Sequence, residues 1–149
     1  MATLQRQLKR AKLIQPNKLQ KDLYKFIRSI EKELLNLEKK RISEDSKDVL
    51  GKPIGFYSAA TEAITGGEKE RGQPFTGIDT ENWFKGFYMQ EVSGVLRFSS
   101  KDPKTQLILN SEHWLSDKLF GLSEKDLKEV ITTRLLPFFI KNSRTLLGV

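Results

Sequence analysis

The chemistry that this chain could perform depends first on a single histidine. His113 is the only histidine in the sequence, and the chain has no cysteine. A metal site needs three or four convergent ligands, and a serine nucleophile needs a strained strand-to-helix turn beside its base. The sequence supplies neither around His113. We therefore predict that His113 is an ordinary residue of a loop or strand end.

Pairs of acids and glycines are the other candidates for catalysis. Glu44-Asp45 and the nearby acids Asp79 and Glu81 all lie in polar stretches. Acid–base work would require burial to raise the pKa of a carboxyl group, and such stretches do not provide it. Gly66-Gly67 lacks the lysine and hydroxyl residue that a phosphate-binding loop carries at fixed offsets. The sequence predicts a protein that is not an enzyme and that holds no cofactor and no metal.

Length and composition favour one domain with a real core. The chain has 149 residues, of which 38% are hydrophobic and 30% charged, a normal balance for a globular protein. No apolar run approaches the length of about 18 residues that a membrane span needs. We expect no membrane association.

Positive charge is concentrated at the N-terminus. Residues 1–41 hold 12 Lys and Arg against 4 Asp and Glu, whereas the remainder holds 14 against 15. A run of charge is often only a solvated helix face, but it also suits an arm that docks on an acidic protein or nucleic acid. Both interpretations stay open here. The candidate docking residues are Arg6, Lys9, Arg10 and Lys12.

Periodic apolar residues predict two N-terminal helices. Leu4, Leu8 and Ala11 indicate a short helix that stops at Pro16, after which Asn17 is placed to cap a second one. An amphipathic helix is expected from Lys18 to Ile42, because its apolar residues recur at steps of three and four. These residues are Leu19, Leu23, Phe26, Ile27, Ile30, Leu34 and Leu37.

Residues 43–82 are expected to form a long loop, interrupted by a short helix at about 57–64. The loop holds most of the chain's glycines, and a loop of this length in a compact domain is usually functional. Strands are predicted at 83–92 and 94–99, joined by a tight turn at Ser93-Gly94, with a third strand at 105–109.

Aromatic residues crowd the first predicted strand. If Trp83, Phe84 and Phe87 alternate along a strand, large apolar groups occupy both of its faces. Base stacking would need many interleaved basic residues, which are missing. We therefore expect one face to pack on the protein's own helices and the other on a neighbouring subunit.

The C-terminal segment predicts a final helix. Ser123 is placed to cap it, Pro137 should kink or split it, and Gly148 should end it. The expected fold class is α+β: a long N-terminal helix and a C-terminal helix packed on a small antiparallel sheet. The expected domains are a basic helical arm at 1–16 and a single α+β domain at 17–149.

Three segments, in order, resemble a known family. They are the loop from Gly72 to Thr80 that leads into Trp83-Phe84, the upstream segment from Gly51 to Glu62, and the downstream segment from Leu119 to Leu127. Together they are similar to the neck and tail-completion proteins of tailed double-stranded-DNA bacteriophages. The resemblance covers roughly residues 20–149.

This resemblance implies a structural virion protein, assembled in the host cytoplasm as a ring subunit at the head–tail junction. Its partners would be copies of itself and other neck, portal or tail proteins, with DNA passing nearby in the ring's lumen. The 43–82 loop would reach onto a neighbouring subunit. The candidate subunit-interface residues are Phe56, Tyr57, Gln73, Pro74, Phe75, Trp83 and Phe87.

A second hypothesis is a small nucleic-acid-binding protein that uses residues 1–41 as a basic helical clamp. Its affinity would fall steeply with salt, because neutralising phosphates releases counterions.

Overall fold

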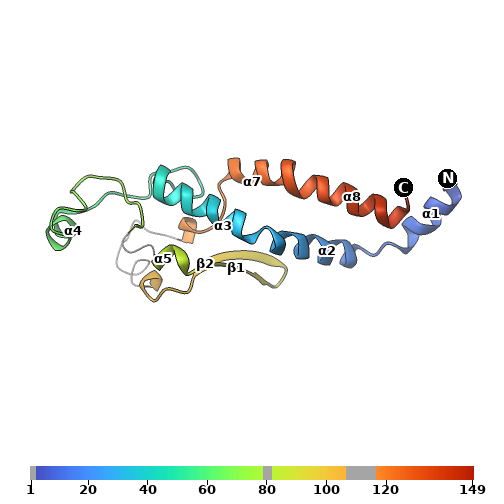
Figure 1. The fold of residues 1–149 in the computed structure, drawn as a ribbon, viewed down its shortest axis with the longest axis horizontal. Coiled ribbons are helices and arrows are strands. Elements are labelled where there is room, and N and C mark those ends of the chain that lie inside the picture. The colour runs from blue at the N-terminus through green and yellow to red at the C-terminus, as the bar shows by residue number, and fades with distance from the viewer. Residues whose placement is uncertain (1–2, 79–81, 107–116) are drawn as a thin grey trace. The chain divides into compact units, whose positions relative to one another are not determined.

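The computed structural model describes residues 3–78, 82–106 and 117–149, which form helices and one antiparallel hairpin (Figure 1). This confirms the α+β class. The chain divides into two compact units: a helical unit made of Met1–Glu31 with Lys125–Val149, and a mixed unit made of Lys32–Glu124. The predicted division into an arm at 1–16 and a single domain at 17–149 stays a prediction.

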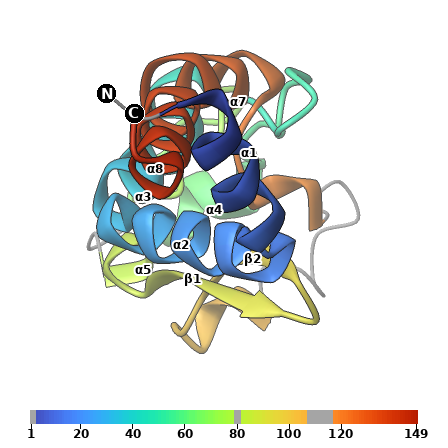
Figure 2. The same ribbon diagram turned by 90° about the vertical axis from the view of Figure 1, so that its right-hand side faces the viewer.

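The helical unit brings the two ends of the chain together. It contains α1 (Leu4–Leu13), α2 (Pro16–Ser29) and α8 (Leu136–Leu147); α2 runs alongside α8, and α1 contacts α8 near the C-terminus (Figures 1 and 2). The rings of Phe26 on α2 and Phe138 on α8 stack in parallel, with centroids 4.3 Å apart. Asn142 Nδ2 donates to Asp22 Oδ2 at 3.1 Å, and Lys18 Nζ donates to the same oxygen at 3.0 Å. These hydrogen bonds lower the pKa of Asp22.

The helix predicted from Lys18 to Ile42 is interrupted. α2 ends at Ser29, and Ile30, with φ −107° and ψ 13°, separates it from α3 (Glu31–Lys40). A π-helical turn, η1 (Arg41–Asp45), then ends at Ser46 in the left-handed region. The predicted cap at Asn17 is wrong. Gln15 holds the N-cap position, and Pro16 opens α2, where its missing N–H costs no hydrogen bond.

Pro137 splits the C-terminal helix as predicted. α7 (Glu124–Val130) begins directly after Ser123 and passes into a π-helical turn, η3 (Ile131–Leu135), before α8. A proline cannot donate to the carbonyl one turn earlier, so the helix widens just before it. Gly148 ends α8 with φ +75°, which confirms the predicted stop.

The hairpin of the mixed unit joins β1 (Phe87–Val92) to β2 (Val95–Ser100), with Phe87 opposite Ser100 and Val92 opposite Val95. Ser93 and Gly94 both have positive φ, at 52° and 78°, which matches the two-residue turn that the sequence predicts. Thr105 and Gln106 are helical, so the third strand is wrong at these positions. Residues 107–109 lie outside the described residues, as do His113 and the Asp79-Thr80 turn.

The first strand begins at Phe87, four residues later than the predicted start at residue 83. Trp83 and Phe84 belong to a four-residue helix, α5 (Asn82–Lys85), which ends at Gly86. The Ser100 hydroxyl donates to the Trp83 carbonyl at 3.1 Å, and a Cβ at Gly86 would lie 2.8 Å from that hydroxyl. The absence of a side chain at Gly86 therefore lets the hairpin close onto α5. The prediction that Trp83 and Phe84 lie on opposite faces of a strand is therefore wrong.

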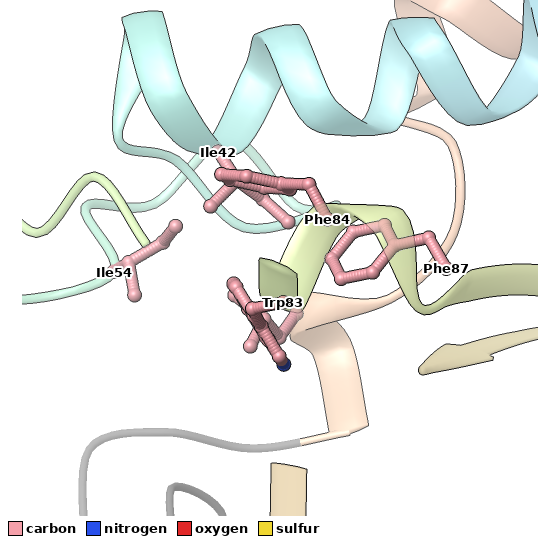
Figure 3. Packing of buried hydrophobic residues seen from close by; sticks show 6 residues of the cluster. Ile42, Ile54, Trp83, Phe84 and Phe87 are labelled. Atoms are coloured by element: carbon pink, nitrogen blue, oxygen red, sulfur yellow. The ribbon is translucent and has the colours of Figure 1, made fainter. Parts of the chain in front are cut away.

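The core of the mixed unit is aromatic. Trp83 lies edge-on to Phe87, with ring centroids 4.9 Å apart, and 5.3 Å from the Phe84 ring (Figure 3). Trp83 Nε1 donates to the buried Thr105 Oγ1 at 3.1 Å. The remaining buried members of this cluster are Ile42, Ile54 and Leu119. Helical geometry at α5, rather than two faces of a strand, gathers the aromatic side chains.

Candidate functional site

An ordered loop at residues 46–78, here called the 46–78 loop, is the feature of the mixed unit that best fits a binding role. Figure 1 shows it carrying the short helix α4 (Ala59–Ile64) away from α5 and the hairpin. Its two arms pair through a bridge between Phe56 and Pro74. Tyr57 N–H donates to the Gln73 carbonyl at 2.9 Å, and Gly72 N–H donates to the Tyr57 carbonyl at 3.0 Å. The loop is thus a hydrogen-bonded ribbon.

The base of the loop is tied to the core. The Ser46 hydroxyl donates to the Phe75 carbonyl at 2.6 Å, and Phe75 N–H donates to the Gly55 carbonyl at 2.9 Å. The half-buried Phe75 ring lies 6.3 Å from that of Trp83. Gly77, with φ +68°, allows the closest approach, because a Cβ there would lie 2.6 Å from the Trp83 ring. Glycine at this position is required by packing as well as by backbone conformation.

The tip of the loop is also held by its own polar groups. The Ser58 hydroxyl caps α4 by accepting from Thr61 N–H at 3.2 Å. Beyond the helix, Thr65 Oγ1 accepts from Lys69 N–H at 3.1 Å, and Glu62 Oε2 accepts from Arg71 N–H at 3.3 Å. These hydrogen bonds give the tip of the loop a defined conformation.

The predicted interface residues fall into three groups: core residues, an exposed residue, and residues that pack or pair within the loop. Trp83 and Phe87 are 4% and 7% exposed and belong to the protein's own core, so they offer a neighbour almost no surface. Phe56 is 56% exposed on the loop. The structure also adds Ile64, 85% exposed at the end of α4, which the sequence-based choice missed. Its signal was a large apolar residue directly before a Thr-Gly-Gly turn.

Four of the predicted interface residues, Tyr57, Gln73, Pro74 and Phe75, act mainly within the loop. The half-buried Tyr57 ring lies 6.0 Å from the Phe75 ring, and Tyr57 Oη accepts from Thr76 N–H at 3.2 Å. Gln73 and Pro74 are exposed on the returning arm, where they pair with Tyr57 and Phe56 as described above. The contacts of Tyr57 and Phe75 therefore hold the loop in shape. Phe56 and Ile64 are large apolar residues that the loop exposes.

The four basic docking candidates all lie exposed on α1. Arg10 is engaged within the helical unit, where its Nη1 donates to the Leu147 carbonyl at 3.3 Å. A cation suits this place, because the last carbonyls of α8 carry partial negative charge. Gly148 leaves room for the guanidinium group, which a Cβ would overlap. Arg6, Lys9 and Lys12 remain available to a partner.

Positive charge belongs to the whole helical unit rather than to α1 alone. Residues 1–31 and 125–149 hold 13 Lys and Arg against 4 Asp and Glu, a net charge of +9. Residues 32–124 hold 13 against 15, a net of −2. The C-terminal residues 125–149 thus add to the positive charge of residues 1–41.

A buried pair of charged residues was not foreseen. Glu38 on α3 is fully buried, and its Oε1 accepts from Gly121 N–H at 2.8 Å. Arg41 Nη2 donates to the Leu119 and Gly121 carbonyls at 2.6 and 3.1 Å, and its Nη1 donates to the Lys47 carbonyl. The signal was present, because Glu38 lies four residues after Leu34 and four before Ile42, on the apolar side of the helix.

Burial raises the pKa of Glu38 to about 7, against the opposing effects of the Gly121 hydrogen bond and the Arg41 charge. The folded protein therefore binds this proton more tightly than the unfolded chain, whose carboxyl has a pKa near 4.5. We expect the free energy of unfolding to fall as the pH rises from about 4.5 to about 7, by on the order of 3 kcal/mol. Urea unfolding at successive pH values measures this fall.

Glu38→Gln is the matched variant, because its amide oxygen can still accept from Gly121 N–H but cannot titrate. Its stability should stay nearly constant over the same pH range. Parallel pH profiles for the two proteins would show that Glu38 is not the titrating group.

The described parts of the chain hold no group of three or more potential metal ligands. No described helix is long and apolar enough to cross a membrane. In comparisons with protein-family models, curated proteins and solved structures, no match to this chain was found.

Proposed function

We propose that this protein is a structural virion protein that acts by self-assembly, as a ring subunit at the head–tail junction of a tailed bacteriophage. Its place would be in a neck, tail-terminator or tail-completion layer, where it would also dock to adjacent ring or portal proteins. The phage setting comes from the ordered resemblance of the three sequence segments. The mode of action comes from the 46–78 loop.

The observation that carries the proposal is the combination of order and exposure in this loop. Its backbone and polar side chains are hydrogen-bonded, yet Phe56 and Ile64 remain 56% and 85% exposed. Leu50, in the same loop, is also 58% exposed. Large apolar side chains exposed on a hydrogen-bonded loop favour a role in binding another protein. No catalytic role is proposed.

The loop variant Phe56→Ser with Ile64→Gln tests this role. Removing two apolar anchors from an interface costs about 2 kcal/mol each, so the dissociation constant should rise roughly 30-fold per anchor. Sedimentation over a concentration series measures the loss of assembly. Urea unfolding serves as the control and should change little, because both side chains are exposed. Assembly at wild-type concentrations would contradict a role for the loop.

The charge of the helical unit favours a second candidate function, nucleic-acid binding. Along α2 the exposed residues Lys18, Lys21, Lys25 and Arg28 recur at steps of three and four, on the side opposite the apolar residues. A stripe of this kind suits a phosphate backbone. Duplex binding that survives near-physiological salt would favour this function over assembly.

A further inference from the structure

The N-terminal helix α1 exposes an apolar stripe that the proposed function does not use. Leu4 and Leu8 are 71% and 53% exposed, and Ala11 is exposed as well. Steps of four and three residues place these three side chains on one side of the helix, here called the α1 stripe. No residue of α1 is buried. Leu13, which is 74% exposed, follows Leu4 by about two and a half turns and therefore lies on the opposite side.

The contact between α1 and α8 leaves this stripe uncovered. Gln7 and Ile14 are the partly buried residues of the segment 3–14. Arg10 lies between them at steps of three and four, and its Nη1 donates to the Leu147 carbonyl of α8. These spacings put Gln7, Arg10 and Ile14 on one side of α1, and this side packs on α8. The leucines of the α1 stripe therefore stay in solvent within the helical unit.

The charges around the α1 stripe have one sign. Residues 1–21 hold six Lys and Arg and no Asp or Glu. Of these cations, Arg6, Lys9 and Lys12 are exposed on α1 and lie outside the stripe. A helix with leucines on one side, cations on the others and no acid is typical of a segment that lies in the interface of an anionic bilayer. There the apolar side chains enter the boundary between headgroups and acyl chains, and the cations meet the negative headgroups.

The surface that suits α1 must be apolar beneath the helix and negative around it. A nucleic acid would meet the cations, but its phosphates offer nothing to Leu4 and Leu8. A second copy of this chain offers two units with net charges of +9 and −2, neither of which is strongly negative. A groove on a different protein would need negative charge along the whole of α1 to match cations without an acid. An anionic bilayer has both properties over its entire surface.

We propose that α1 binds to the surface of an anionic lipid bilayer, with the α1 stripe inserted at the level of the headgroups. Binding of this kind needs no spanning helix, so it is compatible with the absence of one among the described residues. It departs from the expectation of no membrane association, which considered only apolar runs long enough to span. The inference goes beyond the proposed self-assembly and does not rest on it.

Site-specific fluorescence tests the proposal directly, because the chain has no cysteine of its own. An environment-sensitive fluorophore is attached to Leu4→Cys in one preparation and to Leu13→Cys in another, at two positions of nearly equal exposure on opposite sides of α1. Vesicles with equal parts of phosphatidylcholine and phosphatidylglycerol should shift the emission at the Leu4 position to shorter wavelength and leave that at the Leu13 position nearly unchanged. Vesicles of phosphatidylcholine alone should shift neither. Equal shifts at the two positions would overturn the proposal, because the α1 stripe would not direct the binding.

Co-sedimentation of the unlabelled protein with the same vesicles measures affinity. Leu8→Gln should weaken binding to the anionic vesicles about tenfold or more, because a leucine leaves the apolar phase, whereas Leu13→Gln should change it little. Lys9→Gln with Lys12→Gln should weaken it about fivefold per charge, and added salt should weaken the binding of wild type. Urea unfolding of each variant should match that of wild type, because the substituted side chains are exposed.

The outcomes separate this inference from the proposed self-assembly, which is measured without lipid. Absence of binding to anionic vesicles, or equal binding to neutral ones, would overturn the inference alone. An emission shift at the Leu4 position that requires duplex DNA, or that appears in the protein alone as its concentration rises, would also overturn it, because nucleic acid or a second copy would then cover the α1 stripe. A monomer at every concentration that binds anionic vesicles through Leu8 would support the inference and contradict the proposed function.

Discussion

Trp83→Ala is expected to destabilise the mixed unit by about 3–5 kcal/mol, the usual cost of truncating a large buried aromatic residue. The Trp83 ring contacts those of Phe75, Phe84, Phe87 and Phe120 and is 4% exposed. Alanine would leave a cavity at the centre of this cluster. It would also remove the ring against which Gly77 packs. Urea unfolding followed by circular dichroism measures the loss.

Two controls separate packing from hydrogen bonding in this prediction. Trp83→Phe keeps a ring but removes the donor to Thr105 Oγ1, so it should cost less than alanine. Phe56→Ala removes an aromatic side chain of the same unit that is 56% exposed and should change the unfolding free energy little. Equal effects of Trp83→Ala and Phe56→Ala would show that Trp83 is not a core residue.

Arg41→Met is expected to cost about 3–5 kcal/mol, although methionine fills a similar volume. The guanidinium group of Arg41 donates to the carbonyls of Lys47, Leu119 and Gly121, which it holds around the end of α3. Methionine has no donor to offer these oxygens. It also removes the positive charge that opposes the raised pKa of Glu38. Thermal and urea unfolding both report this loss.

The adjacent residue provides the control for Arg41. Lys40 is exposed and lies 4.0 Å from Glu44, and a surface pair of this kind contributes little. Lys40→Met should therefore change stability by no more than about 0.5 kcal/mol. Arg41→Lys should lie between the two, since one ammonium group cannot span three carbonyls as a planar guanidinium does. A loss for Arg41→Met as small as for Lys40→Met would contradict the structural role of the buried pair.

Elements governed by neighbouring residues could be predicted from the sequence. The Ser93-Gly94 turn, the split at Pro137 and the stop at Gly148 depend on the backbone preferences of the residues involved. The short helix at α4 likewise follows from Ser58 and the glycines after Ile64. Local chemistry was sufficient in these places.

Elements that depend on distant partners could not be predicted. α5 exists because Ser100 bonds the Trp83 carbonyl and Gly86 and Gly77 leave room around it, contacts that the apolar pattern does not encode. A run of aromatic residues was therefore interpreted as a strand. The sequence spacing places Glu38 on the apolar side of its helix, but it does not identify the hydrogen-bond partners of Glu38 and Arg41 at Leu119 and Gly121, about 80 residues along the chain.

The functional role of the long loop stays a prediction, and the structure shows which of the predicted interface residues are buried and which are exposed. The sequence predicted that the long loop would be functional, and the structure gives this loop an ordered, exposed surface. Trp83 and Phe87 proved to be core residues, because size and hydrophobicity do not distinguish a buried aromatic side chain from one at an interface. Exposure makes that distinction, and it also identified Ile64.

The central claim, that this protein works by self-assembly, is tested most directly by its mass in solution. Light scattering should be recorded on purified protein over a range of concentrations at near-physiological salt, with and without duplex DNA. We predict one discrete multimer whose mass does not depend on DNA, as a closed ring requires. A monomer at every concentration that gains mass only by binding DNA would contradict the account and support the nucleic-acid-binding alternative.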